Sequence, residues 1–145
     1  MISLAKKTFS ANADTLQDIR ASVRQACEKQ AATTEQIENI VLAINEACMN
    51  IIQHAYENEP DKDIILEIFS SKSDKKKEMI FQLTDHADCI DQLKIKSRDL
   101  NDISPGGLGV HMIQELMDHV CYIQTDTESQ SKSGNTLELR KIIHP

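Results

Sequence analysis

The stretch Gly106-Gly107-Leu108-Gly109 holds three of the four glycines in this 145-residue chain. Glycine lets the backbone adopt positive φ angles and approach a ligand closely. Apolar residues at helical spacing follow directly, at Met112, Ile113, Leu116, Met117 and Val120. The unpaired N–H groups at the start of such a helix can hold phosphate oxygens. The stretch therefore predicts a phosphate-binding turn, and an ordinary loop that enters a helix is the alternative.

Two well-known nucleotide-binding loops do not match this turn. A Walker A loop ends in Gly-Lys followed by Ser or Thr, whereas Gly109 is followed by Val110 and His111. A dinucleotide-binding fingerprint would need a small residue where Met112 stands, and a strand before the glycines, but a polar segment precedes them. Phosphate binding at this turn would therefore need a different fold.

A second informative stretch runs from Asn45 to Tyr56, inside a helix that we expect over about 34–57. Glu46, Asn50 and His54 are four residues apart, so they share one stripe beside the apolar face. Polar groups there are costly unless they are solvated or used. An amide oxygen is a suitable ligand for Mg²⁺, and a carboxylate can act as a general base. A solvated helix face is the alternative, and the stripe taken alone favours it.

The third candidate is Asp85, at the point where a predicted strand ends. An aspartate there usually caps a turn, but in a pocket it could accept a hydrogen bond from an exocyclic amine such as that of adenine. The polar segment after it has no clear periodicity and is long for a connection inside a compact domain. We expect residues 86–105 to form a lid that is mobile without ligand.

The remaining patterns predict the fold class. A first helix should begin at Asp14 as N-cap and continue to Cys27. Strands are expected over Ile2–Phe9, Asp63–Phe69, Glu78–Thr84, Val120–Thr125 and Thr136–Ile143, the second and third forming a hairpin. This order predicts one α+β domain over residues 1–145, a two-layer sandwich with helices packed on one face of a mixed, mostly antiparallel sheet.

Composition narrows the possible partners. The net charge of −7 argues against a protein that grips nucleic acid through a basic surface. The four cysteines form no Cys-x-x-Cys pair, which fits a reducing compartment better than a metal or redox site. We see neither a signal peptide nor an apolar run of membrane-spanning length. We therefore expect a soluble cytoplasmic protein that contacts neither nucleic acid nor membrane.

Taken together, the order of these motifs resembles the GHKL, or Bergerat-fold, ATPases. Within them it is most similar to the bacterial anti-sigma-factor serine kinases of partner-switching systems, over roughly residues 10–143. The resemblance implies ATP and Mg²⁺ as cofactors. It gives these roles: Asn50 would coordinate Mg²⁺, Glu46 would be the catalytic base, Asp85 would bind the adenine amino group, Gly107, Leu108 and Gly109 would wrap the phosphates, and the adenine-side threonine would fall at Asn135 or Thr136.

The same resemblance implies partners. Such a kinase phosphorylates a serine of a STAS-type anti-anti-sigma protein, sequesters a sigma factor and forms a homodimer. One motif departs from the family: the adenine box Asp-x-Gly-x-Gly is here Asp85-His86-Ala87-Asp88-Cys89. If its first glycine needs positive φ, Ala87 would be strained.

This departure motivates an alternative, a nucleotide-binding partner-switch regulator with little or no kinase activity, which would act by binding alone. A third interpretation is the ATPase module of a two-component histidine kinase. It is weaker, because no phosphoacceptor-histidine hairpin precedes the domain.

Overall fold

The computed structural model describes residues 1–87, 107–123 and 134–143, with the side chains of residues 107–110 left out. These ranges form a five-stranded sheet of order β1-β2-β3-β5-β4, in which every neighbouring pair is antiparallel. The strands are β1 Ile2–Ser10, β2 Asp63–Lys72, β3 Lys77–Asp85, β4 His119–Ile123 and β5 Asn135–Ile143. The helices are α1 Leu16–Lys29, α2 Thr34–Asn50 and α4 Gly107–Leu116, with a 3₁₀ turn η1 at Ala13–Thr15 and a π-turn η2 at Ile51–Ala55.

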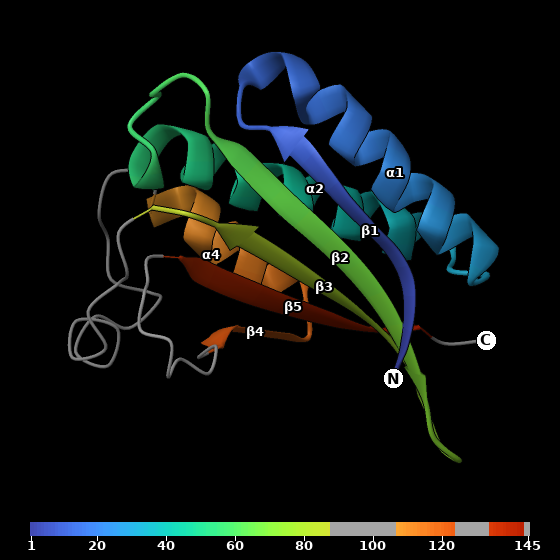
Figure 1. Ribbon diagram of the computed structural model, residues 1–145. Helices are drawn as coiled ribbons and strands as arrows, with labels where there is room; N and C mark the ends of the chain where they lie inside the picture. The colour runs from blue at the N-terminus through green and yellow to red at the C-terminus, as the bar shows by residue number, and fades with distance from the viewer. Residues whose placement is uncertain (88–106, 124–133, 144–145) are drawn as a thin grey trace.

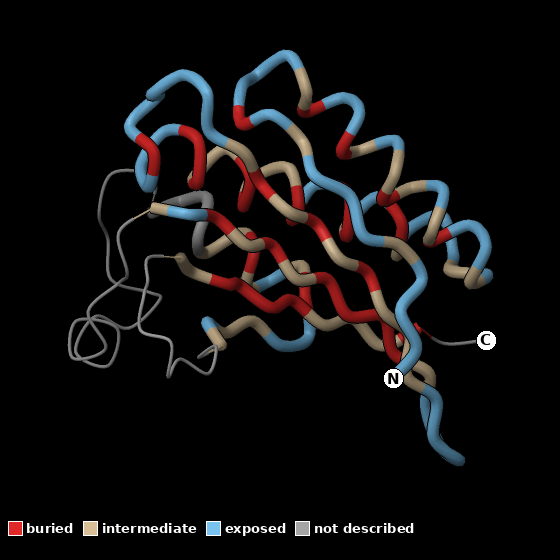
Figure 2. The backbone as a smooth tube through the Cα atoms, in the orientation of Figure 1, coloured by how far each residue is buried: buried red, intermediate tan, exposed pale blue. Residues whose placement is uncertain are grey.

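The helices cover one face of the sheet, and no helix of the described ranges covers the other (Figure 1). The core lies between the two layers, as the buried positions in Figure 2 show. Because side chains alternate along a strand, Ile64, Leu66 and Ile68 of β2 all point toward the helices. They share the core with an apolar stripe of α2 that includes Ile40 and Ile44. Burying each such side chain contributes about 1.5–3 kcal/mol. The predicted α+β two-layer arrangement is confirmed.

A side-chain cap fixes the start of α2, whereas Thr15, the N-cap residue of α1, makes no side-chain cap hydrogen bond. At α2, the Thr33 hydroxyl accepts from the N–H of Gln36, and the Gln36 side chain accepts from the N–H of Thr33. The first helix begins differently from the prediction. Asp14 is not its cap but lies inside the turn η1, where Asn12 Oδ1 accepts from the Asp14 N–H. The capping residue is therefore Asn12, two residues before the predicted cap, and it caps the turn η1 that precedes α1.

The second helix is not α-helical to its end. Beyond Asn50 it continues as the π-turn η2, which closes with a 2.9 Å bond from the Tyr56 N–H to the Ile51 carbonyl. A π-turn uses one residue more than an α-turn, so it rotates the side chains that follow. Ala55 is exposed and Tyr56 is buried, and His54 is exposed as well.

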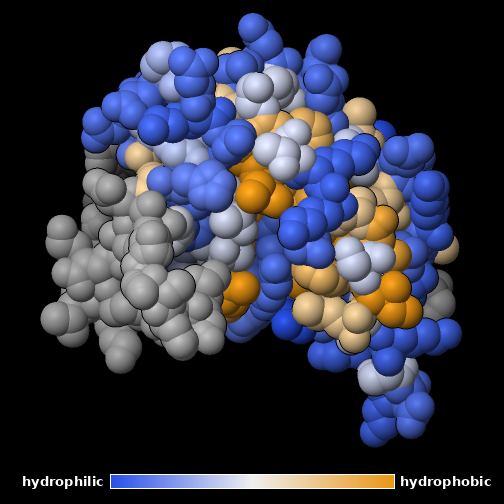
Figure 3. Space-filling view, viewed as in Figure 1, coloured by the Kyte–Doolittle hydropathy of each residue, from blue (hydrophilic) through white to orange (hydrophobic). Residues whose placement is uncertain are grey.

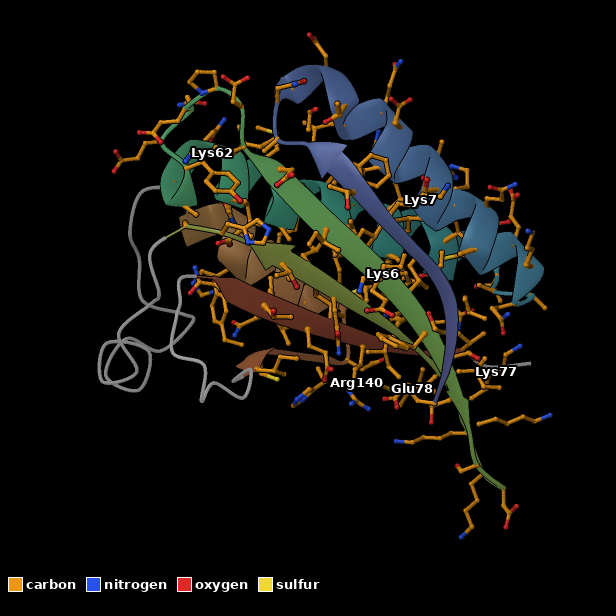
Figure 4. The ribbon with its side chains drawn as sticks, in the orientation of Figure 1. Lys6, Lys7, Lys62, Lys77, Glu78 and Arg140 are labelled. Atoms are coloured by element: carbon orange, nitrogen blue, oxygen red, sulfur yellow. The ribbon has the colours of Figure 1, made fainter. Side chains whose placement is uncertain are left out.

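The open face of the sheet carries a chain of polar contacts across β3 and β5. Arg140 donates to Glu138 Oε2 at 2.9 Å and to Glu78 Oε1 at 3.2 Å (Figure 4), and Gln82 donates to Glu138 Oε1 at 2.9 Å. Hydrophilic side chains elsewhere on this face interrupt its hydrophobic patches (Figure 3). Because these contacts join residues on paired strands, they favour the register that places Asp85 opposite Asn135.

Candidate functional site

The candidate site lies at the edge of the sheet where β3 ends and β5 begins. Asp85 is the last residue of β3, and it pairs with Asn135, the first residue of β5. Its side chain lies on the same face of β3 as those of Phe81 and Leu83, so it points to the helix side. The start of α4 and the end of η2 lie toward the same end of the molecule (Figure 1).

The carboxylate of Asp85 is a buried acceptor held in one orientation. The residue is only 4% exposed. The N–H of Ala87 donates to Oδ1 at 2.9 Å, and the amide of Asn135 donates to the same oxygen at 3.0 Å. Burial raises the pKa of Asp85, while these hydrogen bonds oppose the rise. A buried carboxylate of this kind is stabilised by any further N–H donor brought to it.

The backbone at Ala87 does not have the positive φ that would strain an alanine. Among the described residues, four non-glycine residues have positive φ, and Ala87 is not one of them. A positive φ occurs instead at Gly134, the residue before β5, where φ is +134° and glycine is favoured. A Cβ on Gly134 would lie 3.2 Å from the carbonyl oxygen of Asp85, and its N–H donates to the Ala87 carbonyl at 3.0 Å.

The register of β5 separates the two positions considered for the adenine-side threonine. Asn135 lies beside the Asp85 carboxylate on the helix side. Thr136 is buried, but its hydroxyl lies 2.9 Å from that of Thr84. Neighbouring residues of a strand point to opposite faces, so Thr136 projects from the open face and Asn135 toward the site. A role for Thr136 in binding remains a prediction, and the geometry favours Asn135.

Glu46 and Asn50 lie on α2, partly exposed, as the helical spacing predicted. Within the described ranges neither side chain makes a hydrogen bond or an ion pair. Their neighbour Asn45, by contrast, accepts from Arg20 of α1 at 2.8 Å. The two side chains are therefore available to a ligand. Asn50 is the last residue of α2, immediately before the π-turn.

The predicted phosphate-binding turn is described only from Gly107 onward. Gly107 is the first residue of α4, which packs against α2, so a helix does begin where the glycines predicted it. The side chain of Leu108 is not described, and Gly106 lies outside the described residues. The expected lid over 86–105 also lies outside them, apart from His86 and Ala87.

Two tyrosines near Asp85 were not predicted. Tyr56 is 3% exposed, and its hydroxyl donates to the Asp63 carbonyl at 2.6 Å and accepts from the His86 N–H at 2.7 Å. Tyr122 of β4 is 37% exposed, so its phenol is only partly desolvated; this partial burial and the nearby Asp85 carboxylate both raise its pKa. Periodicity could not locate Tyr56, because the π-turn moves the buried position by one residue. Its only signal was an aromatic residue at a helix end in a chain with few aromatics.

Other features of the described ranges contribute nothing to this site. They contain no group of three or more His, Cys, Asp or Glu that could hold a metal. A cavity of about 460 Å³ opens between the start of α1 and the loop before β2, beside Asn12, Met49 and Lys62. Its lining includes neither Asp85 nor Asn50.

None of the helices described is long and apolar enough to cross a membrane.

The chain is similar in sequence to known serine-protein kinases. The serine-protein kinase RsbW of Bacillus subtilis (strain 168) is 26% identical over 132 residues, which cover 87% of this chain and 77% of the relative. The serine-protein kinase RsbW of Staphylococcus aureus (strain MRSA252) is 29% identical over 141 residues, which cover 92% and 82%.

Solved structures share the fold. The RsbU and RsbW domains of Rv1364c from Mycobacterium tuberculosis match with a TM-score of 0.61 at 16% identity, over 98% of this chain and 34% of that chain. The SiaB-SiaC complex from Pseudomonas aeruginosa matches with a TM-score of 0.59 at 12% identity, over 97% and 91%.

A family model for the histidine kinase-like ATPase domain matches residues 9–141, which is nearly the whole chain. The match includes α2 with Glu46 and Asn50, the Asp85 end of β3, and the glycine turn that begins α4. The chain therefore belongs to the histidine kinase-like ATPase domain family.

Proposed function

We propose that this protein is an ATP-dependent protein serine kinase of the anti-sigma type. It binds Mg-ATP, phosphorylates a serine of a STAS-type anti-anti-sigma protein, and binds a sigma factor when that partner has been released. We further propose that it acts as a cytoplasmic homodimer. The main structural support is the buried Asp85 carboxylate, held by Ala87 and Asn135 on the helix side of the sheet. The names of the sequence relatives support the reaction class.

Adenine recognition is the role proposed for Asp85. The adenine amino group would donate to the carboxylate, which compensates for the loss of water around a buried charge. Guanine presents a carbonyl oxygen at that position, and two acceptors repel one another. The site should therefore select ATP over GTP.

The phosphates and Mg²⁺ are assigned to α2 and the start of α4. The donors fit: Asn50 offers an amide oxygen and Glu46 a carboxylate, and neither is engaged by another described residue. The backbone N–H groups at Gly107 and Gly109 would hold phosphate oxygens at the start of the helix. Bound Mg²⁺ would neutralise negative charge on the phosphates.

The transfer itself needs a base and a nucleophile. Glu46 would accept the proton of the partner's serine hydroxyl while the hydroxyl oxygen attacks the γ-phosphorus, and the bond from that phosphorus to ADP breaks. The products are phosphoserine and ADP. The added charge on the partner's surface would weaken its binding to this protein.

The alternative, a regulator that binds nucleotide without transferring phosphate, rested on the altered adenine box. The observed backbone weakens it, because Ala87 has no positive φ and needs no glycine there. Glu46 also remains partly exposed and unengaged within the described ranges.

Calorimetry with Mg-ATP and Mg-GTP tests the binding step. Transfer of labelled γ-phosphate to a STAS-type protein from the same genome tests the reaction. We expect ATP-selective binding, and transfer that Glu46→Gln slows strongly. Binding with no transfer to any such partner would favour the alternative, and no nucleotide binding would refute both.

A further inference from the structure

The π-turn η2 delivers Tyr56 to the site. In a continuous α-helix the buried positions Cys48, Ile51 and Ile52 would be followed by Ala55. Ala55 is instead exposed, and Tyr56, one residue later, is 3% exposed. Such π-turns are rare and frequently occur at functional sites. The extra residue therefore turns the Tyr56 ring inward at the end of the helix that carries Asn50.

The hydroxyl of Tyr56 joins two strands at their site ends. It donates to the carbonyl of Asp63, the first residue of β2, at 2.6 Å, and it accepts from the N–H of His86, the residue after β3, at 2.7 Å. A tyrosine hydroxyl can donate and accept at once, whereas phenylalanine can do neither. The ring alone would fill the apolar space, so these two contacts are the specific contribution of a tyrosine.

His86 links this hydroxyl to the Asp85 carboxylate. Fixing the N–H of His86 limits the rotation of the two peptides around it, and the next N–H, that of Ala87, donates to Asp85 Oδ1 at 2.9 Å. The N–H of Gly134 holds the Ala87 carbonyl from the other side at 3.0 Å. The carboxylate thus takes its orientation from a turn that Tyr56 anchors.

We propose that Tyr56 is a positioning residue for adenine recognition: its hydroxyl anchors the turn that orients the Asp85 carboxylate and connects the Asn50 end of α2 to the adenine end of β3. This inference rests on the proposed nucleotide site. A purely structural role for the hydroxyl would lower stability without changing the choice between ATP and GTP.

A double-mutant cycle separates these roles. Binding of Mg-ATP and Mg-GTP is measured by calorimetry for the wild type, Tyr56→Phe, Asp85→Asn and the double variant. Val23→Ala, a buried substitution in α1, is the control for lost stability. Tyr56→Phe should weaken ATP binding about tenfold and reduce the ATP-over-GTP preference, because a misoriented acceptor loses most of its hydrogen bond. The double variant should bind ATP no more weakly than Asp85→Asn.

The outcomes distinguish this inference from the proposed function. If Asp85→Asn loses selectivity while Tyr56→Phe keeps wild-type affinity and selectivity, the positioning role is refuted and the nucleotide site stands. Equal weakening of ATP and GTP by Tyr56→Phe, additive with Asp85→Asn, also refutes it. Failure of the wild type to bind ATP, or an Asp85→Asn variant with unchanged binding, overturns the nucleotide site itself.

Hydrogen exchange in the wild type provides a test that needs no variant. The N–H of His86 should exchange as slowly as the paired N–H groups of β3, because its acceptor is a buried hydroxyl. Rapid exchange at His86 would refute the anchor even if Tyr56→Phe does not fold.

Discussion

Replacement of Asp85 by Asn should separate the stability of this protein from its proposed binding activity. The substituted amide is nearly the same size, and its oxygen can still accept from the Ala87 N–H and from Asn135. What disappears is a charge at a position that is 4% exposed. The second oxygen becomes an NH₂ group, which donates where the adenine amino group also donates.

The substitution should weaken ATP binding without lowering the free energy of unfolding. ATP binding should weaken by about 1–3 kcal/mol, roughly five- to 150-fold, because one hydrogen bond is lost and two donors face each other. The free energy of unfolding at pH 7 should stay equal or rise, because burial makes the ionised Asp85 unfavourable. A catalytic or binding group that costs stability is a common feature of active sites.

The pH dependence of stability tests independently whether the ionised Asp85 stabilises or destabilises the fold. The folded-state pKa of Asp85 is raised above its ordinary value of 3.8, so the native state binds more protons than the unfolded state between the two values. The contribution of this group to stability is therefore present at low pH and is lost as pH rises from about 3.8 through the raised pKa. The stability advantage of Asp85→Asn over the wild type should grow across that window and then stay constant.

Denaturant unfolding from pH 3.5 to 8 and calorimetry with ATP measure both effects. Asp74→Asn, in the exposed turn between β2 and β3, serves as the matched control and should change neither. A variant that binds ATP as tightly as the wild type would remove Asp85 from adenine recognition. A loss of more than about 1 kcal/mol at pH 7 would show that the charge stabilises the fold, against the argument from burial.

Three further substitutions test the rest of the site. Asn50→Ala should abolish or strongly weaken the Mg²⁺-dependent part of ATP binding, measured by calorimetry with and without Mg²⁺, and an unchanged dependence would remove Asn50 from the metal site. Glu46→Gln should keep ATP affinity but slow phosphoryl transfer by ~10²–10⁴-fold, the usual contribution of a positioned base, and transfer at the wild-type rate would exclude that role. Gly134→Ala should destabilise the protein by about 1–3 kcal/mol and weaken ATP selectivity, because its φ is +134° and the new Cβ would press on the Asp85 carbonyl; unfolding and binding curves like those of the wild type would contradict this.

Much of the architecture could be predicted from local patterns. The apolar alternation along β2 and β3 can be read within each strand. The helical spacing of Ile37, Ile40 and Ile44 can be read within one helix. The position of Asp85 at a strand end and of the glycines before a helix are also local features. Such signals survive without knowledge of the fold, because each is set by the geometry of one segment.

The contacts that shape the candidate site depend on segments far apart in the chain. The choice of Asn135 over Thr136 requires the β3–β5 register, which pairs residues about fifty positions apart and cannot be read from either strand alone. Tyr56 enters the site because a π-turn adds one residue, and helical periodicity assumes that no such turn exists. The positive φ beside this turn falls on Gly134, just before β5, and its N–H donates to the Ala87 carbonyl, a contact between segments far apart in the chain. The sequence by itself thus determined the fold class and the candidate chemical groups, whereas only tertiary packing decided which side chains meet, because side-chain direction depends on register and helix rotation.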